Sequence, residues 1–184
     1  MSKTLVISGH PDYKNSKANK AILNEFQRLV PEAEIVRLDE LYPDFDIDVA
    51  AEQKRLSEAD TVVFEFPFWW YSAPSLMRRY FELVLSHGFA YGSAGTALHG
   101  KKLIMSFTAG AKAEAYTPDG AQHYTMDDFT PQLRALANLC GFDYRGEVVS
   151  YGMMLLDPTD LEAKTLYDAR VHDHAQELAR RVEE

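Results

Sequence analysis

Apolar side chains recur along this chain with two spacings, one typical of strands and one typical of helices. Residues 4–8 are a short β-branched and apolar run, which predicts a buried strand. After a polar loop, residues 16–30 place Ala18, Ile22 and Phe26 at helical spacing on one side of a predicted helix. The beginning of the chain therefore predicts a strand, a loop and a helix.

The alternation of strand and helix patterns continues to the end of the chain. Two connections, residues 39–49 and 88–100, exceed ordinary loop lengths, which is typical of functional or partner-binding loops. Gly141 ends one of the helical patterns, as glycine often does. The remaining predicted strands are residues 34–38, 61–66, 102–107 and 147–153, and the remaining predicted helices are residues 50–59, 74–85, 130–140 and 158–182.

Strands that alternate with helices imply parallel pairing with right-handed crossovers, hence a three-layer α/β sandwich. We predict a five-stranded parallel sheet of order 2-1-3-4-5 in a single domain that spans residues 1–184. In such a sheet the ligand crevice lies beyond the carboxyl ends of the strands, where the strand order reverses. The segments after the first, third and fourth strands should therefore meet at one site.

Charge and cysteine content narrow the classes of function. Twenty-eight acidic against nineteen basic side chains give a net charge of -9, and the absence of a Lys/Arg-rich run argues against a nucleic-acid partner. The apolar run at residues 4–8 is too short for a signal peptide or a membrane span, so we expect a cytoplasmic protein. Cys140 is the single cysteine and lies in an apolar stretch, which predicts a buried, unreactive thiol. With no HExxH motif, and with His172 and His174 on different faces of a helix, we expect no metal site.

The loop after the first strand, residues 8–19, brings hydroxyl, amide and imidazole donors to the start of a helix. Helix N-termini offer free backbone N–H groups and a partial positive charge, which suit a phosphate. The alternative is that Ser16 only caps the helix, with His10 and Asn19 solvated nearby. The loop alone leaves both open, and it contains neither GxGxxG nor GxxxxGK[ST].

The segment after the third strand holds five aromatic residues within residues 66–71, including both tryptophans of the chain. Single aromatics are more often core than ligand contacts, but these follow a strand at the mouth of the expected crevice. A flat ring system needs a planar apolar wall with nearby backbone donors and acceptors. We therefore favour a ligand-binding segment.

Small residues follow the fourth strand and let the backbone approach a ligand closely. Thr108, Ala109 and Gly110 begin this segment. Farther along, Tyr116 and His123 could donate hydrogen bonds to charge that develops on a bound ring or on an acceptor oxygen; the alternative is ordinary loop polarity.

Together these three segments resemble the flavodoxin-like NAD(P)H:quinone oxidoreductase family, over residues 5–152. Residues 41–48, 85–92 and 95–101 are similar in particular to the bacterial ancillary subunits of the glutathione-regulated potassium-efflux system. Where the family has Thr-Thr-Gly-Gly, residues 108–111 read Thr-Ala-Gly-Ala, which puts side-chain contacts from 109 and 111 in doubt.

The resemblance implies a flavodoxin-like fold and a set of site residues. It implies FMN rather than FAD as cofactor, because the C-terminal extension of the larger FAD-binding members is not seen here. Catalytic roles beside the flavin fall to Tyr116 and His123. The implied cofactor-binding residues are His10, Ser16, Lys17, Ala18 and Asn19 at the phosphate, Pro67, Phe68, Trp69 and Trp70 along the isoalloxazine, and Thr108, Ala109 and Gly110 on its far side.

The implied activity is two-electron transfer from NAD(P)H, as co-substrate, through FMN to a quinone-type acceptor. A homodimer is implied as well. The alternative function is that of a flavin-bearing regulatory subunit, peripheral at the inner membrane, that activates a potassium-efflux antiporter as its transporter partner.

Overall fold

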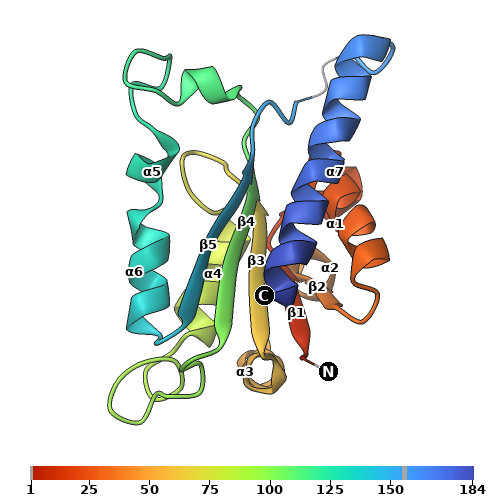
Figure 1. The fold of residues 1–184 in the computed structure, drawn as a ribbon. Coiled ribbons are helices and arrows are strands. Elements are labelled where there is room, and N and C mark those ends of the chain that lie inside the picture. The colour runs from red at the N-terminus through yellow and green to blue at the C-terminus, as the bar shows by residue number, and fades with distance from the viewer. Residues whose placement is uncertain (1, 155–156) are drawn as a thin grey trace.

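A parallel sheet with helices on both faces forms the centre of the molecule (Figure 1). The computed structural model describes residues 2–154 and 157–184. Its sheet has five strands in the order β2-β1-β3-β4-β5, so the predicted three-layer α/β sandwich of order 2-1-3-4-5 is confirmed. Within these two stretches, no helix is both long and apolar enough to cross a membrane.

The strands follow the predicted positions closely, with additional short helices in the connections. The strands are β1 (Thr4–Ser8), β2 (Glu34–Arg37), β3 (Thr61–Pro67), β4 (Lys102–Thr108) and β5 (Asp143–Ser150). The helices are α1 (Ala18–Leu29), α2 (Leu38–Leu41), α3 (Val49–Glu58), α4 (Ser75–Val84), α5 (Met126–Phe129), α6 (Pro131–Leu139) and α7 (Leu161–Glu183), with 3-10 turns η1 (Tyr13–Asn15) and η2 (Ala113–Ala115).

The last strand differs most from its prediction, since residues 147–153 were expected and β5 begins four residues earlier. A bulge explains the difference: Leu103 pairs with Tyr144 and Met105 with Glu147, so β5 carries one extra residue opposite β4. Gly146 takes the left-handed conformation that the bulge needs, with φ 86°. The extra residue interrupts the alternation from which a strand is recognised.

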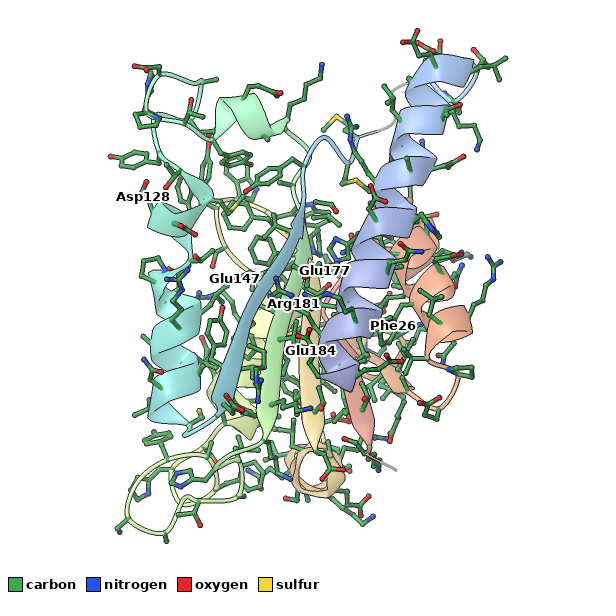
Figure 2. All side chains as sticks on the ribbon, viewed as in Figure 1. Phe26, Asp128, Glu147, Glu177, Arg181 and Glu184 are labelled. Carbon is green, nitrogen blue, oxygen red and sulfur yellow. The ribbon has the colours of Figure 1, made fainter. Side chains whose placement is uncertain are left out.

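Two smaller corrections concern connections. The strand predicted at residues 34–38 ends at Arg37, because Leu38 starts the short helix α2 and is itself fully buried. The long connection at residues 39–49 is therefore partly helical. Before α6, the short helix α5 begins with a reciprocal cap, in which the side chains and backbone of Thr125 and Asp128 bond to each other. Asp128 is labelled in Figure 2.

The sheet separates two apolar cores. Leu5 and Ile7 of β1 point to the core under α3, α4 and α6, whereas Val6 points to the core under α1 and α7. Phe26 of α1 is fully buried in the second core (Figure 2). The sequence of β1 is apolar throughout because both of its faces are covered.

On the face covered by α1 and α7, the strands change from apolar to polar near their carboxyl ends. Successive residues of a strand alternate between faces, so positions two apart share a face. Of the polar side chains, Ser8, Glu65 and Ser106 are buried and Ser150 is half-buried, and all four bond to one another or to the covering helices. The changes are Val6 to Ser8, Val63 to Glu65, Ile104 to Ser106 and Val148 to Ser150.

Cys140 follows α6 and is 2% exposed, which confirms the predicted burial of the thiol. Burial raises the pKa of this thiol to about 11, so it stays protonated at neutral pH. The two histidines of α7 face differently, as expected: His172 is exposed beside Glu25, whereas His174 is buried.

Candidate functional site

A cavity of about 590 Å³ opens at the carboxyl ends of β1, β3 and β4. The strand order reverses between β1 and β3, so the cavity lies where ligands bind in open α/β sheets. It brings nine of the predicted site residues together from three separate loops. The cavity is lined by His10, Asp12, Asn15, Ser16, Lys17, Ala18, Asn19, Pro67, Trp69, Thr108, Gly110, Met153 and Met154.

The N-terminus of α1 forms one wall of the cavity. Among the described residues, no side chain caps this helix, and Ser16 makes no hydrogen bond to its first turn. The alternative that Ser16 acts as the helix cap is therefore wrong in this structure. Backbone N–H groups of the first turn are left for a ligand, and their partial positive charge, together with Lys17, favours an anion.

His10 stands beside this wall as a neutral imidazole. Its Nδ1 accepts the backbone N–H of Asp12 at 3.0 Å, which leaves Nε2 to carry the ring hydrogen. Burial lowers the pKa of His10 below its usual value, with Asp39 and Asp12 opposing that shift. The ring meets Trp69 edge-on, with 5.3 Å between the ring centroids. His10 can thus donate one hydrogen bond without carrying charge.

The aromatic segment after β3 forms a tight turn that separates the two tryptophans. Trp69 and Ser72 exchange backbone hydrogen bonds, while Trp70 and Tyr71 between them have φ values of 49° and 62°. Two successive positive φ angles define a type I′ turn, a conformation that L residues other than Gly, Asn and Asp adopt at a cost. Trp69 lines the cavity, whereas Trp70 is 93% exposed and lines a separate hollow beside Pro11.

Phe68 and Tyr116 lie in an aromatic cluster rather than on the cavity wall. Phe68 is buried, with its ring centroid 5.6 Å from that of Phe107 and 6.3 Å from that of Tyr116. Tyr116 also packs against Tyr151, at 5.5 Å. Burial raises the pKa of Tyr116, so its phenol keeps its proton at neutral pH.

His123 lies apart from the cavity. It is exposed and has a positive φ of 58° in the loop that follows Tyr116. Neither Tyr116 nor His123 lines the cavity, so the catalytic roles predicted for these two residues stay predictions.

The segment after β4 contributes mainly through its backbone and through Thr108. The Thr108 hydroxyl donates to Asn19 Oδ1 at 3.2 Å, which links β4 to α1 under the cavity. Ala109 is fully buried, and its N–H donates to the Ser150 carbonyl at 2.8 Å, so it offers no side chain to a ligand. Gly110 lies on the cavity wall.

Several residues of the site were missed by sequence reasoning. Met153 and Met154 line the cavity, although the alternation pattern assigned Met153 to a strand. Glu65 is the most informative omission, because it is 1% exposed and bonds to both Ser8 and Asn19 directly below the cavity. A single carboxylate inside an apolar strand is the signal that could have identified it.

A switch-point cavity with an uncapped helix and an aromatic wall defines a protein of the flavodoxin-like class. Residues 2–175 match the family described as flavodoxin-like fold, and the chain belongs to this family. The predicted flavodoxin-like fold is thereby confirmed.

The most informative relatives are two proteins of the same name. General stress protein 14 of Bacillus subtilis (strain 168) is 40% identical over 151 residues, which are 82% of this chain and 86% of that protein. The crystal structure of general stress protein 14 from Treponema denticola, in complex with FMN, is 30% identical, with a TM-score of 0.87 over 97% of this chain and 99% of that one.

An NADPH-quinone reductase from P. pentosaceus shares the fold at 24% identity and a TM-score of 0.77, covering 95% of this chain and 96% of that one. The expected likeness to ancillary subunits of potassium-efflux systems stays a prediction, as does the homodimer.

Proposed function

We propose that this protein binds FMN in the cavity and acts as an NAD(P)H-dependent oxidoreductase toward a quinone-type acceptor. The observation that carries the proposal is the meeting of an uncapped helix N-terminus and an aromatic wall in one cavity. A relative with FMN bound and a fold neighbour described as an NADPH-quinone reductase support it. The cavity volume of about 590 Å³ lies within the range of about 300–1,000 Å³ typical of cofactor sites.

The donor set of the cavity fits a phosphorylated flavin. Ser16, Asn19 and the first N–H groups of α1 can hold the phosphate, with Lys17 adding positive charge. Trp69 offers a planar wall for the ring system. Bound FMN supplies the redox chemistry, a two-electron transfer from NAD(P)H to the acceptor.

The aromatic cluster beside the cavity suits a flat second substrate. Tyr71 stacks on Phe129 with 5.1 Å between centroids, and Tyr116 packs edge-on against Phe129. Tyr71 is 47% exposed, so part of this cluster is open to solvent. Tyr116, whose raised pKa keeps it protonated, can donate a hydrogen bond to an acceptor oxygen.

The test uses the two adjacent tryptophans as a matched pair. Trp69→Ala and Ser16→Ala should each weaken FMN binding, since stacking on an aromatic ring is worth about 1–3 kcal/mol and a hydrogen bond to a charged group about 1.5–3 kcal/mol. Trp70→Ala should leave FMN affinity unchanged, because Trp70 does not line the cavity.

FMN affinity is measured by fluorescence titration of the apoprotein, and activity by anaerobic bleaching with NADH or NADPH followed by reoxidation with a quinone. A wild-type protein that does not bind FMN would refute the proposal. Binding of FMN without bleaching by either nucleotide would refute the oxidoreductase activity alone.

A further inference from the structure

Glu65 is a buried carboxyl group below the proposed phosphate site. It lies in β3, where the neighbouring residues Phe64 and Phe66 are fully buried, and it is 1% exposed itself. Ser8 of β1 donates its hydroxyl to Glu65 Oε2 at 2.7 Å, and Asn19 Nδ2 of α1 donates to Glu65 Oε1. Neither of these partners is charged. A buried carboxyl without a cation is costly to ionise, so its retention calls for a reason.

The hydrogen bonds give Glu65 control over two residues of the cavity. An amide side chain presents hydrogens on one side and an oxygen on the other. Because Asn19 turns its Nδ2 toward Glu65, its Oδ1 is directed to Thr108, which donates its hydroxyl at 3.2 Å. Glu65 therefore fixes the amide orientation of Asn19 and, through it, the hydroxyl of Thr108. Both residues line the cavity.

The protonation state of Glu65 matters because a phosphate would lie nearby. Burial raises the pKa of Glu65 to about 7, opposed by the hydrogen bonds from Asn19 and Ser8. Tyr13 interacts with Glu65, and burial raises the pKa of Tyr13 as well, so its phenol is uncharged at neutral pH. His174 bonds to Ser106, the residue paired with Glu65 in the sheet, and His10 follows Gly9, whose backbone N–H donates to the Glu65 carbonyl. Burial lowers the pKa of both imidazoles. A phosphate in the cavity disfavours a second negative charge below it, which favours the protonated acid.

We propose that Glu65 is a positioning residue of the phosphate site: as a neutral acid, with Oε2 donating its proton to Ser8 Oγ and Oε1 accepting from Asn19, it holds Asn19 and Thr108 in their binding orientation and keeps the base of the cavity uncharged. This inference rests on the proposed function, because it requires that the cavity bind FMN. Binding of FMN would then be accompanied by proton uptake at Glu65 wherever the free protein is ionised.

The test measures the dissociation constant of FMN at pH 6 and pH 9 for the wild type, Glu65→Gln and Glu65→Leu. Gln has the shape of the neutral acid and cannot ionise. The ratio of the wild-type to the Glu65→Gln dissociation constant should rise about tenfold from pH 6 to pH 9, the effect of one unit of pKa difference between free and bound protein. Titration of the phosphate itself is common to both proteins and cancels in this ratio. Glu65→Leu should bind FMN at least tenfold more weakly than Glu65→Gln at both pH values, because Asn19 loses its orienting partner.

Ser106→Ala provides the matched control. Ser106 is a fully buried polar residue on the same face of the sheet, but it bonds to His174 and does not line the cavity. The FMN affinity of the Ser106→Ala variant should depend on pH in the same way as that of the wild type. A ratio of the wild-type to the Glu65→Gln dissociation constant that does not rise from pH 6 to pH 9, or Gln and Leu variants that both match the wild type, would overturn the role of Glu65 while leaving the proposed function intact. Failure of the wild type to bind FMN would overturn both the proposed function and the role of Glu65. If Glu65→Leu does not fold, the comparison of the wild type with Glu65→Gln at the two pH values still tests the role of Glu65.

Discussion

The buried histidine of α7 should by itself lower the free energy of unfolding in mild acid. His174 is 3% exposed and lies between two hydroxyl groups, with Ser106 Oγ 2.8 Å from its Nε2 and Ser150 Oγ 2.8 Å from its Nδ1. Burial lowers its pKa to about 4 from an ordinary value of 6.5. The folded protein therefore holds a neutral imidazole at a pH where the unfolded chain would bind a proton.

The sign and size of the effect follow from linkage. Between pH 6.5 and pH 4 the unfolded state binds more protons than the folded state, so the free energy of unfolding falls as the pH falls. Each unit of pKa difference is worth about 1.4 kcal/mol, and the unfolded imidazole is already half protonated at pH 6.5, so His174 alone should remove about 2 kcal/mol of stability between pH 6.5 and pH 4.5. The stability is fully present above pH 6.5.

Glu65 acts in the opposite direction and has to be removed from the comparison. Its folded pKa of about 7 exceeds its ordinary value of 4.5, so its contribution to stability is fully present below pH 4.5 and is lost as the pH rises through 7. In the wild type the two groups largely cancel between pH 4.5 and 6.5. The experiment therefore compares Glu65→Gln with the double variant Glu65→Gln, His174→Gln, both as apoproteins.

Urea unfolding at pH 7.5, 6.5, 5.5 and 4.5, followed by circular dichroism, gives the free energy of unfolding of each protein. The single variant should lose about 2 kcal/mol more than the double variant between pH 6.5 and pH 4.5. Titration of surface carboxylates is common to both proteins and cancels. Equal slopes in the two proteins would refute the reasoning, because His174 would then not be held neutral by the fold.

Two further predictions concern the backbone near the cavity. Gly9→Ala would place a Cβ 2.6 Å from Met77 Cβ, so α4 has to shift. Urea unfolding should show a free energy of unfolding lower by about 1–3 kcal/mol. Gly110→Ala should lose less stability, because its Cβ meets only the flexible end of the Met154 side chain at 3.1 Å. Equal losses would contradict this. Trp70→Asn should stabilise the apoprotein by about 1 kcal/mol, because Asn tolerates the left-handed conformation at φ 49° and the exposed indole contributes little packing. Trp70→Val should destabilise it, and the reverse order of the two variants would count against strain at this turn.

The fold could be predicted from the sequence wherever burial alone determines the pattern of apolar residues. The bounds of β1 were predicted without error, because every residue of Thr4–Ser8 is buried on a sheet covered on both faces. The parallel pairing followed from the alternation of strands and helices, since crossover connections force neighbouring strands to run in the same direction. The convergence of the three loops followed in turn, because parallel strands all end at the same edge.

What the sequence could not supply depends on contacts between distant segments. Trp69 and Trp70 are identical neighbours in the sequence, and only the left-handed turn at Trp70 and Tyr71 sends one ring to the cavity and the other to solvent. The bulge at Gly146 displaced the predicted fifth strand for the same reason, since it exists only opposite β4. The role of Glu65 required the positions of Ser8 and Asn19, which lie far from it along the chain.

The polar end of the sheet contains two hydrogen-bonded groups that have different consequences. Ser106 and Thr108 are two residues apart on the same face of β4, yet Ser106 turns to His174 of α7 and Thr108 to Asn19 of α1. Buried polar pairs add little net stability over apolar side chains of the same shape, so stability alone gives little reason to keep either group. The pair of Thr108 and Asn19 lines the cavity, so ligand binding explains why it is polar. The pair of Ser106 and His174 does not line the cavity. The first should therefore govern cofactor affinity, and the second only the stability of the fold toward acid.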